Sequence, residues 1–215
     1  MKSRRILKGL KQRKSRRVRK QRKSRKGRRD LGRGIETKSY PNGDEYEGEV
    51  FQENSSSLGP KTYPNGQGTM RYKNGDIYEG NWSFGTKKGN GKMIFSNGNE
   101  VEGNWSRAGE LSDGTMRFSN GDVYEGKFNR NEPHGQGKMT YSNGTVYEGN
   151  WHYGNKSEKG KMSYHNGSTF KGNFSYDAKS GPGEMKYADG SRSHGSYTRG
   201  SKTKGSSFQV STKEK

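Results

Sequence analysis

Residues 137–151 read GKMTYSNGTVYEGNW, and this stretch decides the fold. Met139 and Tyr141 alternate with other residues before the Asn-Gly pair, and Tyr147 and Trp151 follow it at even spacing. Two short segments of this kind around Asn-Gly are the strongest short-range signal for a β-hairpin. The stretch therefore predicts two antiparallel strands that carry methionine and ring side chains on one face.

The length of the loop follows from the same four residues. Side chains alternate between the two faces of a strand, so these four share a face only if the numbers of paired residues have an even sum. A two-residue loop at Asn143-Gly144 gives an odd sum, whereas a three-residue loop at 142–144 gives an even one. We therefore expect a type I turn followed by a glycine in the left-handed conformation.

The hairpin is repeated along the chain at a spacing of 23 residues. Its first glycine recurs without insertion at Gly68, Gly91, Gly114, Gly137, Gly160 and Gly183. A diverged copy that contains Tyr40, Gly43 and Tyr46 precedes this run, with an insertion around residues 55–57. One such unit cannot bury its apolar face alone, so we expect neighbouring repeats to supply the core for each other.

Two sets of residues are predicted to build the array. The turn glycines are Gly75, Gly98, Gly121, Gly144, Gly167 and Gly190. The repeat aromatic face comprises Tyr78, Trp82, Trp105, Tyr124, Phe128, Tyr147, Trp151, Phe170 and Phe174. This face either packs internally or offers a hydrophobic groove to a peptide or to a second copy of the chain.

Glycine also occurs inside the second strand, where Gly149 stands between Tyr147 and Trp151. Glycine normally weakens a strand interior, so we expect it to leave room for a ring that covers the backbone. A change from glycine to valine here should cost more than strand propensity alone. The glycine-rich stretch at residues 134–137 is expected to turn the chain into the next hairpin.

The pattern Y-x-G-x-W followed by G-x-G-x-M-x-Y-x-N-G resembles the MORN repeat, named for membrane occupation and recognition nexus, over roughly residues 40–200. The resemblance implies an all-β fold, an elongated single-layer antiparallel sheet with one hairpin per repeat. It also implies roles as a scaffold, a dimerisation module or a module that lies close to lipid. Both terminal repeats depart from the pattern, as the capping units of a repeat array do.

The positive charge of the chain is concentrated at one end. The net charge is +20, and residues 1–39 account for +17 of it, with 19 Lys or Arg and two acids. We therefore predict three parts: a basic arm at 1–39 that is disordered or forms a short helix, a repeat array at 40–200, and a polar tail at 201–215.

The arm is expected to bind a polyanion, because 17 Lys or Arg and no acid fall within residues 1–29. Each neutralised phosphate releases counterions, which makes such binding strong and salt-dependent. Nuclear targeting is a second interpretation of the same charge. Both are favoured over a solvated tail, because charges of one sign at this density repel each other unless a partner neutralises them. The arm lacks rings that could stack on bases, so contacts with the backbone are expected. The predicted polyanion-binding residues are Arg4, Arg5, Lys8, Lys11, Arg13, Lys14, Arg16, Arg17, Arg19, Lys20, Arg22, Lys23, Arg25, Lys26, Arg28 and Arg29.

The opposite face of the predicted sheet carries a column of glutamates, which are Glu47, Glu79, Glu102, Glu125 and Glu148. These carboxylates could bind cations or a basic partner. The simpler interpretation is a solvated face on which they pair with lysines such as Lys92, Lys138 and Lys161.

Nothing in the sequence indicates catalysis, a cofactor or a metal site. The chain has no cysteine, and its four histidines do not fall at metal-ligand spacing with carboxylates. The stretch at 89–92 lacks the spacing and the Ser or Thr of a phosphate-binding loop. No apolar run is long enough to cross a bilayer, and the N-terminus lacks the apolar region of a secretory signal.

These observations predict a non-enzymatic structural or adaptor protein. Its array would be a protein-interaction scaffold, and its arm would anchor it to nucleic acid or to an acidic protein surface. The expected setting is intracellular, in the cytoplasm or nucleus, or the interior of a virion; a protist cytoskeletal assembly is a further possibility. The alternative is a peripheral membrane adaptor that adsorbs electrostatically to anionic phospholipids.

Overall fold

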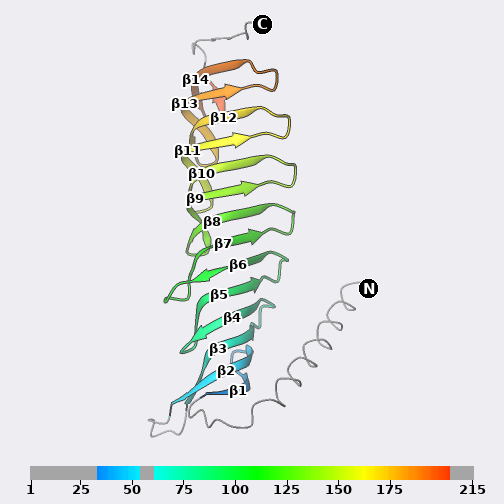
Figure 1. Cartoon of the computed structure of the whole chain (residues 1–215), viewed down its shortest axis with the longest axis vertical. Coiled ribbons are helices and arrows are strands. Elements are labelled where there is room, and N and C mark those ends of the chain that lie inside the picture. Colours follow the sequence, from blue (N-terminus) through cyan, green and yellow to red (C-terminus); the bar gives the residue numbers. More distant parts are fainter. Residues whose placement is uncertain (1–32, 54–60, 204–215) are drawn as a thin grey trace, which may run out of the picture. The chain divides into compact units, whose positions relative to one another are not determined.

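The computed structural model describes residues 33–53 and 61–203. The chain divides into two units, Met1–Arg33 and Gly34–Lys215, and the sheet lies in the second unit apart from its first residue. Within the described residues the structure is all-β, without helices, and forms one antiparallel sheet (Figure 1). Its 15 strands are ordered as they are in the sequence, so every strand pairs with its neighbours along the chain. The predicted fold class is confirmed for this part.

The strands are short and regularly spaced. In chain order they are β1 (Arg33–Ser39), β2 (Glu45–Glu53), β3 (Lys61–Arg71), β4 (Ile77–Ser83), β5 (Thr86–Ile94), β6 (Glu100–Trp105), β7 (Leu111–Arg117), β8 (Val123–Asn129), β9 (Glu132–Thr140), β10 (Val146–His152), β11 (Asn155–Ser163), β12 (Thr169–Ser175), β13 (Ala178–Lys186), β14 (Arg192–Thr198) and β15 (Ser201–Lys202). The sheet therefore begins within the range assigned to the arm, and the described part of it ends within the range assigned to the tail. Whether residues 1–32 are disordered or helical lies outside the described residues.

The register of β9 and β10 confirms the three-residue loop. Tyr147 pairs with Met139, and the sum of paired residue numbers is even throughout this hairpin. The backbone N–H of Tyr141 donates to the carbonyl of Thr145 at 2.8 Å, and that of Gly144 donates to the carbonyl of Tyr141 at 2.9 Å. Gly144 has φ +82°, as the position after a type I turn requires.

The other end of each repeat turns differently from our expectation. The prediction that residues 134–137 turn the chain is wrong, because they lie inside β9, where residues 135–137 pair with β10. The chain turns earlier, at Arg130 (φ +51°) and Asn131 (φ +64°), in a two-residue turn with positive φ at both positions. Positive φ at both positions is the type I′ signature. Gly137 serves strand packing instead, because the ring of Tyr124 lies against it, whereas Gly135 has a positive φ of +72° inside the strand.

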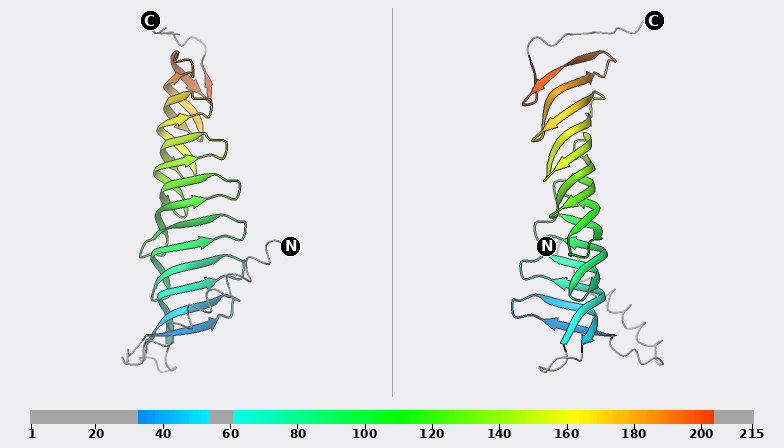
Figure 2. Two further views of the ribbon diagram at one scale, coloured as in Figure 1. Left: turned by 45° about the vertical axis from the view of Figure 1, so that its right-hand side comes forward. Right: turned by 90° about the vertical axis from the view of Figure 1, so that its left-hand side faces the viewer.

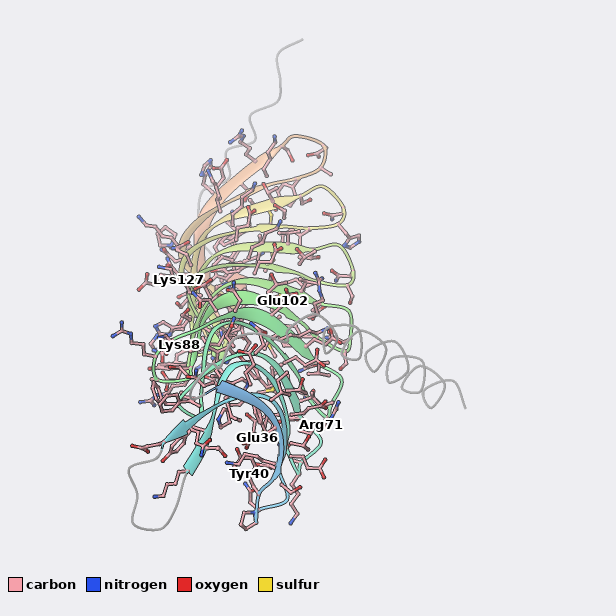
Figure 3. The ribbon with its side chains drawn as sticks, turned by 60° about the horizontal axis from the view of Figure 1, so that its bottom comes forward. Glu36, Tyr40, Arg71, Lys88, Glu102 and Lys127 are labelled. Carbon is pink, nitrogen blue, oxygen red and sulfur yellow. The ribbon has the colours of Figure 1, made fainter. Side chains whose placement is uncertain are left out.

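The sheet is a single twisted layer, as Figure 2 shows from two further sides. Its strands are interrupted by bulges, such as the shift in register between Gly149 and Asn150 on the side of β11. Bulges increase the local twist and bend the strand, and Figure 3 shows the strands curved when the sheet is viewed from one end. A flat single layer would leave its rings half exposed, so this bending is what allows one face to enclose them.

Candidate functional site

A ladder of glycines crosses the sheet, one from each strand from β2 to β14, and each glycine pairs directly with the next. A Cβ atom built on Gly160 would lie 2.5 Å from the ring of Tyr147, and one built on Gly149 would lie 2.6 Å from the Cα of Gly160. The ring of Tyr147 thus lies directly on the backbone of two strands. This contact explains why glycine occupies the middle of every repeat strand.

The predicted aromatic face is buried against itself. Tyr147 meets Trp151 edge to face at 5.2 Å between ring centroids, and it meets Phe174 of the next repeat at 4.9 Å. All nine predicted residues are buried, with exposed fractions between 0 and 7%. In the chain on its own they form the core of the array, and they offer little ring surface to a ligand.

The tyrosine hydroxyls of this face close the bulges. The hydroxyl of Tyr124 donates to the backbone carbonyl of Lys127 at 2.9 Å, and Tyr78 reaches Asn81 in the same way at 3.1 Å. Each acceptor lies three residues further along the strand, next to the bulge. Burial raises the pKa of the Tyr124 hydroxyl to about 12, so the side chain is neutral and remains a hydrogen-bond donor at physiological pH.

The six predicted turn glycines lie along one edge of the sheet, which we call the Asn-Gly edge. All six have positive φ, between +82° and +92°. The asparagine before the glycine accepts a hydrogen bond from the backbone two residues on, as Asn143 does from Thr145. Neighbouring turns are also joined, because Asp122 accepts a hydrogen bond of 2.8 Å from the backbone N–H of Ser142 in the next repeat. These glycines therefore have a structural role.

Comparison with protein families identifies the repeat. The MORN repeat model matches residues 63–77, 78–100, 124–146, 147–169 and 170–192. This chain belongs to the MORN repeat family. The predicted resemblance is confirmed, and the matched segments agree with the repeats that the sheet displays.

Comparisons with individual proteins add little to this assignment. No match was found among curated proteins. The TCP10 domain of Danio rerio CPAP in complex with a STIL peptide aligns with a TM-score of 0.29 and 12% identity, over 76% of this chain and 90% of that chain. The CPAP G-box domain aligns with a TM-score of 0.26 and 14% identity, over 76% and 93%. These values support no conclusion beyond the family assignment.

The stretch between residues 100 and 124, which the family model leaves unmatched, is also the irregular part of the MORN array. Val101 stands where most other repeats have a tyrosine, and the run of ring contacts is interrupted beside it. A cavity of about 40 Å³ lies against Val101, Trp105 and Leu111. The sheet nevertheless continues through β6 and β7, because the glycine ladder is unbroken there.

The sequence did not reveal the lysines that lie on the aromatic face of the MORN array. The ammonium of Lys156 lies 5.5 Å from the ring centroid of Tyr141, donates to its hydroxyl at 3.0 Å and pairs with Asp177 at 3.2 Å. Lys87 has the same position beside Tyr78, where burial lowers the pKa of its amine. These lysines cover the rings with their stems and contribute cation–π contacts, so they belong to the core.

The opposite, polar face carries the predicted glutamate column. Glu148 faces Lys138 and Lys161 on the neighbouring strands, which agrees with a solvated face of paired charges. The alternation of acidic and basic residues is interrupted where Lys161 faces Lys171, and it resumes where Lys171 faces Glu184. A shallow open trough of about 880 Å³ covers this region. It is lined by Glu125, Gln136, Gly137, Lys138, Glu148, Gly149, Lys159, Gly160, Lys161, Lys171, Gly172, Asn173 and Pro182.

The edge opposite the Asn-Gly edge also went unnoticed in the sequence. We call it the tip edge, and its tip residues occupy the first position of each two-residue turn: Phe84, Arg130, Tyr153, Tyr176 and Arg199. Figure 3 shows Lys88 and Lys127 projecting on this side, away from Arg71 near the other edge. The signal was present, since each tip follows a buried Trp, Phe or Tyr by two residues. Recognising this signal in the sequence required knowledge of where the chain turns.

The predicted polyanion-binding residues, Arg4 to Arg29, lie outside the described residues, so their arrangement stays a prediction. Within residues 33–53 and 61–203, no group of three or more His, Cys, Asp or Glu side chains could hold a metal ion. The same part of the chain contains no helix that is long and apolar enough to span a membrane.

Proposed function

We propose that this protein is a non-enzymatic adaptor whose MORN array is an interaction scaffold and whose basic arm, residues 1–39, anchors it to a polyanion. The polyanion is nucleic acid or an acidic protein surface, inside a cell or within a virion. The observation that carries the proposal is the separation of charge, since the arm holds +17 of the net +20. An array that is nearly neutral as a whole is thereby joined to one concentrated cationic segment.

The array has the properties of a scaffold rather than of a catalyst. MORN repeats are themselves a type of repeat scaffold. The aromatic face is closed by its own rings, so the array presents mainly backbone turns and charged side chains to partners. Its binding potential is therefore distributed along repeated surfaces, and the polar trough is one of them.

The trough is suited to an acidic protein segment. Four of its residues are cationic, namely Lys138, Lys159, Lys161 and Lys171, and two are acidic. The cross-strand pair of Lys161 and Lys171 brings like charges together, which destabilises the sheet unless an anionic partner lies between them. A full-length variant with Lys161→Glu and Lys171→Glu should lose binding to an acidic peptide, whereas Arg71→Glu near the Asn-Gly edge should leave it unchanged.

The arm has a different mode of binding. Its charge density implies affinity that falls steeply with salt, because each neutralised phosphate releases counterions. Without rings, its contacts with nucleic acid would be to the backbone and would not select a sequence. The same arm would adsorb to anionic lipid by charge alone, which is the competing membrane function.

One comparison tests the arm. The full chain and a full-length variant with Arg16, Arg17, Arg19, Arg22, Arg25 and Arg28 changed to Gln are titrated with duplex DNA, poly-glutamate and phosphatidylserine vesicles over a salt series. The proposal predicts strong binding to at least one of the first two and a salt slope that is reduced by about five in the variant, since each lost phosphate contact removes about 0.9. Binding to vesicles alone, with no change in the variant, would assign the protein to the membrane class.

A further inference from the structure

We infer that the tip edge of the MORN array binds single-stranded nucleic acid, with Phe84, Tyr153 and Tyr176 stacking on bases while neighbouring cations neutralise phosphates. This surface is separate from the basic arm, and the inference does not depend on what the arm binds. It rests on three properties of the tip residues: their backbone conformation, their exposure and the charges around them.

The tips adopt a backbone conformation that their side chains disfavour. Phe84, Tyr153 and Tyr176 have φ of +47°, +44° and +45°, in the left-handed region. The first position of a type I′ turn favours Asn, Asp or Gly, and bulky side chains there are strained. Asparagine precedes the glycine in every turn of the Asn-Gly edge except the last, which has Asp189, so this chain uses turn-forming residues at the other edge. Large side chains at the tips are therefore kept for a reason other than the turn.

The large side chains at the tips are not explained by burial in the core. Tyr176 is 87% exposed, Phe84 is 64% exposed and Tyr153 is 40% exposed, whereas the core rings of the same repeats are at most 7% exposed. Two tips rest on a second ring: Phe84 lies 5.3 Å from Phe51 and Tyr153 lies 4.7 Å from His152, between centroids. Such a contact orients the ring while it leaves much of its surface open to solvent. Strained, exposed and oriented side chains are typical of binding positions.

The charges at this edge have the sign that a nucleic acid requires. Arg130 stands between Phe84 and Tyr153 in the series of tips, Arg199 follows Tyr176, and both arginines are exposed. Lys88 and Lys127 project from the flanking strands, as Figure 3 shows. The acids of this edge are Glu53, Glu110, Asp113, Glu132, Glu158 and Asp177. Asp113 faces Lys127 across β7 and β8, and Asp177 is paired with Lys156. The turns of the Asn-Gly edge instead carry Asp44, Asp76, Asp122 and Asp189, together with Lys73.

Rings interleaved with cations distinguish a single strand from other polyanions. Nonspecific single-strand binders combine a cationic track with aromatic side chains on which successive bases stack. From Arg130 to Arg199 successive tips are separated by two strands, about 10 Å, and Phe84 lies four strands from Arg130. An extended single strand can therefore bring separate bases onto separate rings. Duplex bases are stacked on each other and offer no free faces. An acidic peptide has no bases that could stack on the rings.

The test is a full-length variant with Phe84→Asn, Tyr153→Asn and Tyr176→Asn, examined by fluorescence anisotropy. Asparagine suits these turn positions, so the melting temperature should stay the same or rise. Affinity for a 20-nucleotide oligo-dT should fall at least about tenfold, because base stacking on each ring contributes a factor of this order. Affinity for a duplex of the same length should change less than twofold. An oligonucleotide with 5-iodouracil should crosslink to Tyr153 or Tyr176 in the unmodified chain.

Several results would overturn the inference. It fails if the unmodified chain does not bind oligo-dT, if the triple variant keeps its affinity for oligo-dT, or if crosslinks fall only within residues 1–39. It also fails if binding to duplex, poly-glutamate or phosphatidylserine vesicles drops by the same factor, since the rings would then serve another partner. The arm is judged separately by its arginine-to-glutamine variant, which should lower single-strand and duplex binding together and reduce the salt slope.

Discussion

The hydroxyl of Tyr147 donates a hydrogen bond to the backbone carbonyl of Asn150, three residues further along β10, at a distance of 2.9 Å. The register with β11 shifts between Gly149 and Asn150, so this carbonyl lies at a bulge. Tyr147 is fully buried, and its ring covers Gly149 and Gly160. One side chain thus fills the core, covers the glycine ladder and satisfies a polar group of the bulge.

Removing this hydroxyl should destabilise the array by about 1–2 kcal/mol, because a buried carbonyl loses its partner. Tyr147→Phe makes this change without loss of the ring. Phe170 occupies the same position one repeat later, without a hydroxyl, so Phe170→Tyr should add the missing hydrogen bond and stabilise by up to about 1 kcal/mol. Urea unfolding followed by tryptophan fluorescence measures both. If both variants changed the free energy of unfolding in the same direction, the role assigned to the hydroxyl would be contradicted.

The glycine ladder should not tolerate even one added methyl group. Gly149→Ala places a Cβ atom 2.6 Å from the Cα of Gly160 and 2.8 Å from the carbonyl oxygen of Lys159, so two strands must separate. We expect a loss of about 3 kcal/mol or more, at the upper end of the range for overpacked cores.

Gly34→Ala is the matched control, since a Cβ atom there meets only Val50, at 4.0 Å. It should be neutral or slightly stabilising, because alanine restricts the unfolded chain. A similar loss of stability in both variants would show that strand propensity, and not the contact between ring and backbone, explains the ladder.

The irregular repeat should show compensation between Val101 and Leu111. A Cβ atom built on Gly103 would lie 2.9 Å from the side chain of Leu111, whereas at Gly149 it would lie 2.6 Å from the hydroxyl of Tyr147. Leu111 therefore lies where other repeats place the tyrosine. Val101→Tyr alone should overpack the site and cost about 1–3 kcal/mol.

Leu111→Ala alone should cost about 2–5 kcal/mol, because it enlarges the existing cavity. In the double variant the new tyrosine fills the space that Leu111 leaves. The two losses should then be smaller than additive by at least about 1 kcal/mol, as a double-mutant cycle in urea measures. Additive losses would mean that the two residues do not share one space.

Most of the fold could be predicted from the spacing of residues. The even spacing of Met139, Tyr141, Tyr147 and Trp151 determined the common face and, through it, the three-residue loop. This inference succeeded because strand geometry has a period of two and permits no other arrangement of those side chains. Repetition then extended one correct hairpin over the array.

The turn at the other edge could not be predicted in the same way. Glycine signals both turns and close packing. Gly137 serves packing and Gly135 has positive φ inside β9, while Arg130 and Asn131 form the turn. Arginine and tyrosine rarely occupy left-handed turn positions, so turn propensities did not predict that the chain turns at the tip residues. The position of Lys156 was not predicted either, because the sequence did not show that its stem lies on rings and its ammonium pairs with Asp177.

The stability of the array should fall in alkaline solution. Burial raises the pKa of Tyr124 to about 12, and burial together with Asp44 and Asp76 does the same for Tyr72, from an ordinary value of 10.0. The unfolded chain therefore releases these protons first. The corresponding stability is fully present below pH 10 and is lost as the pH rises from about 10 towards 12.

Tyr124→Phe should separate this effect from the hydrogen bond of the hydroxyl. At pH 8 the variant should be less stable than the parent by about 1 kcal/mol, because the carbonyl of Lys127 loses its donor. Between pH 10 and pH 11.5 its free energy of unfolding should fall less steeply, because one proton with a raised pKa has been removed. Urea titrations at several pH values measure both. Parallel pH profiles for the variant and the parent would mean that the ionisation of Tyr124 does not contribute to alkaline unfolding.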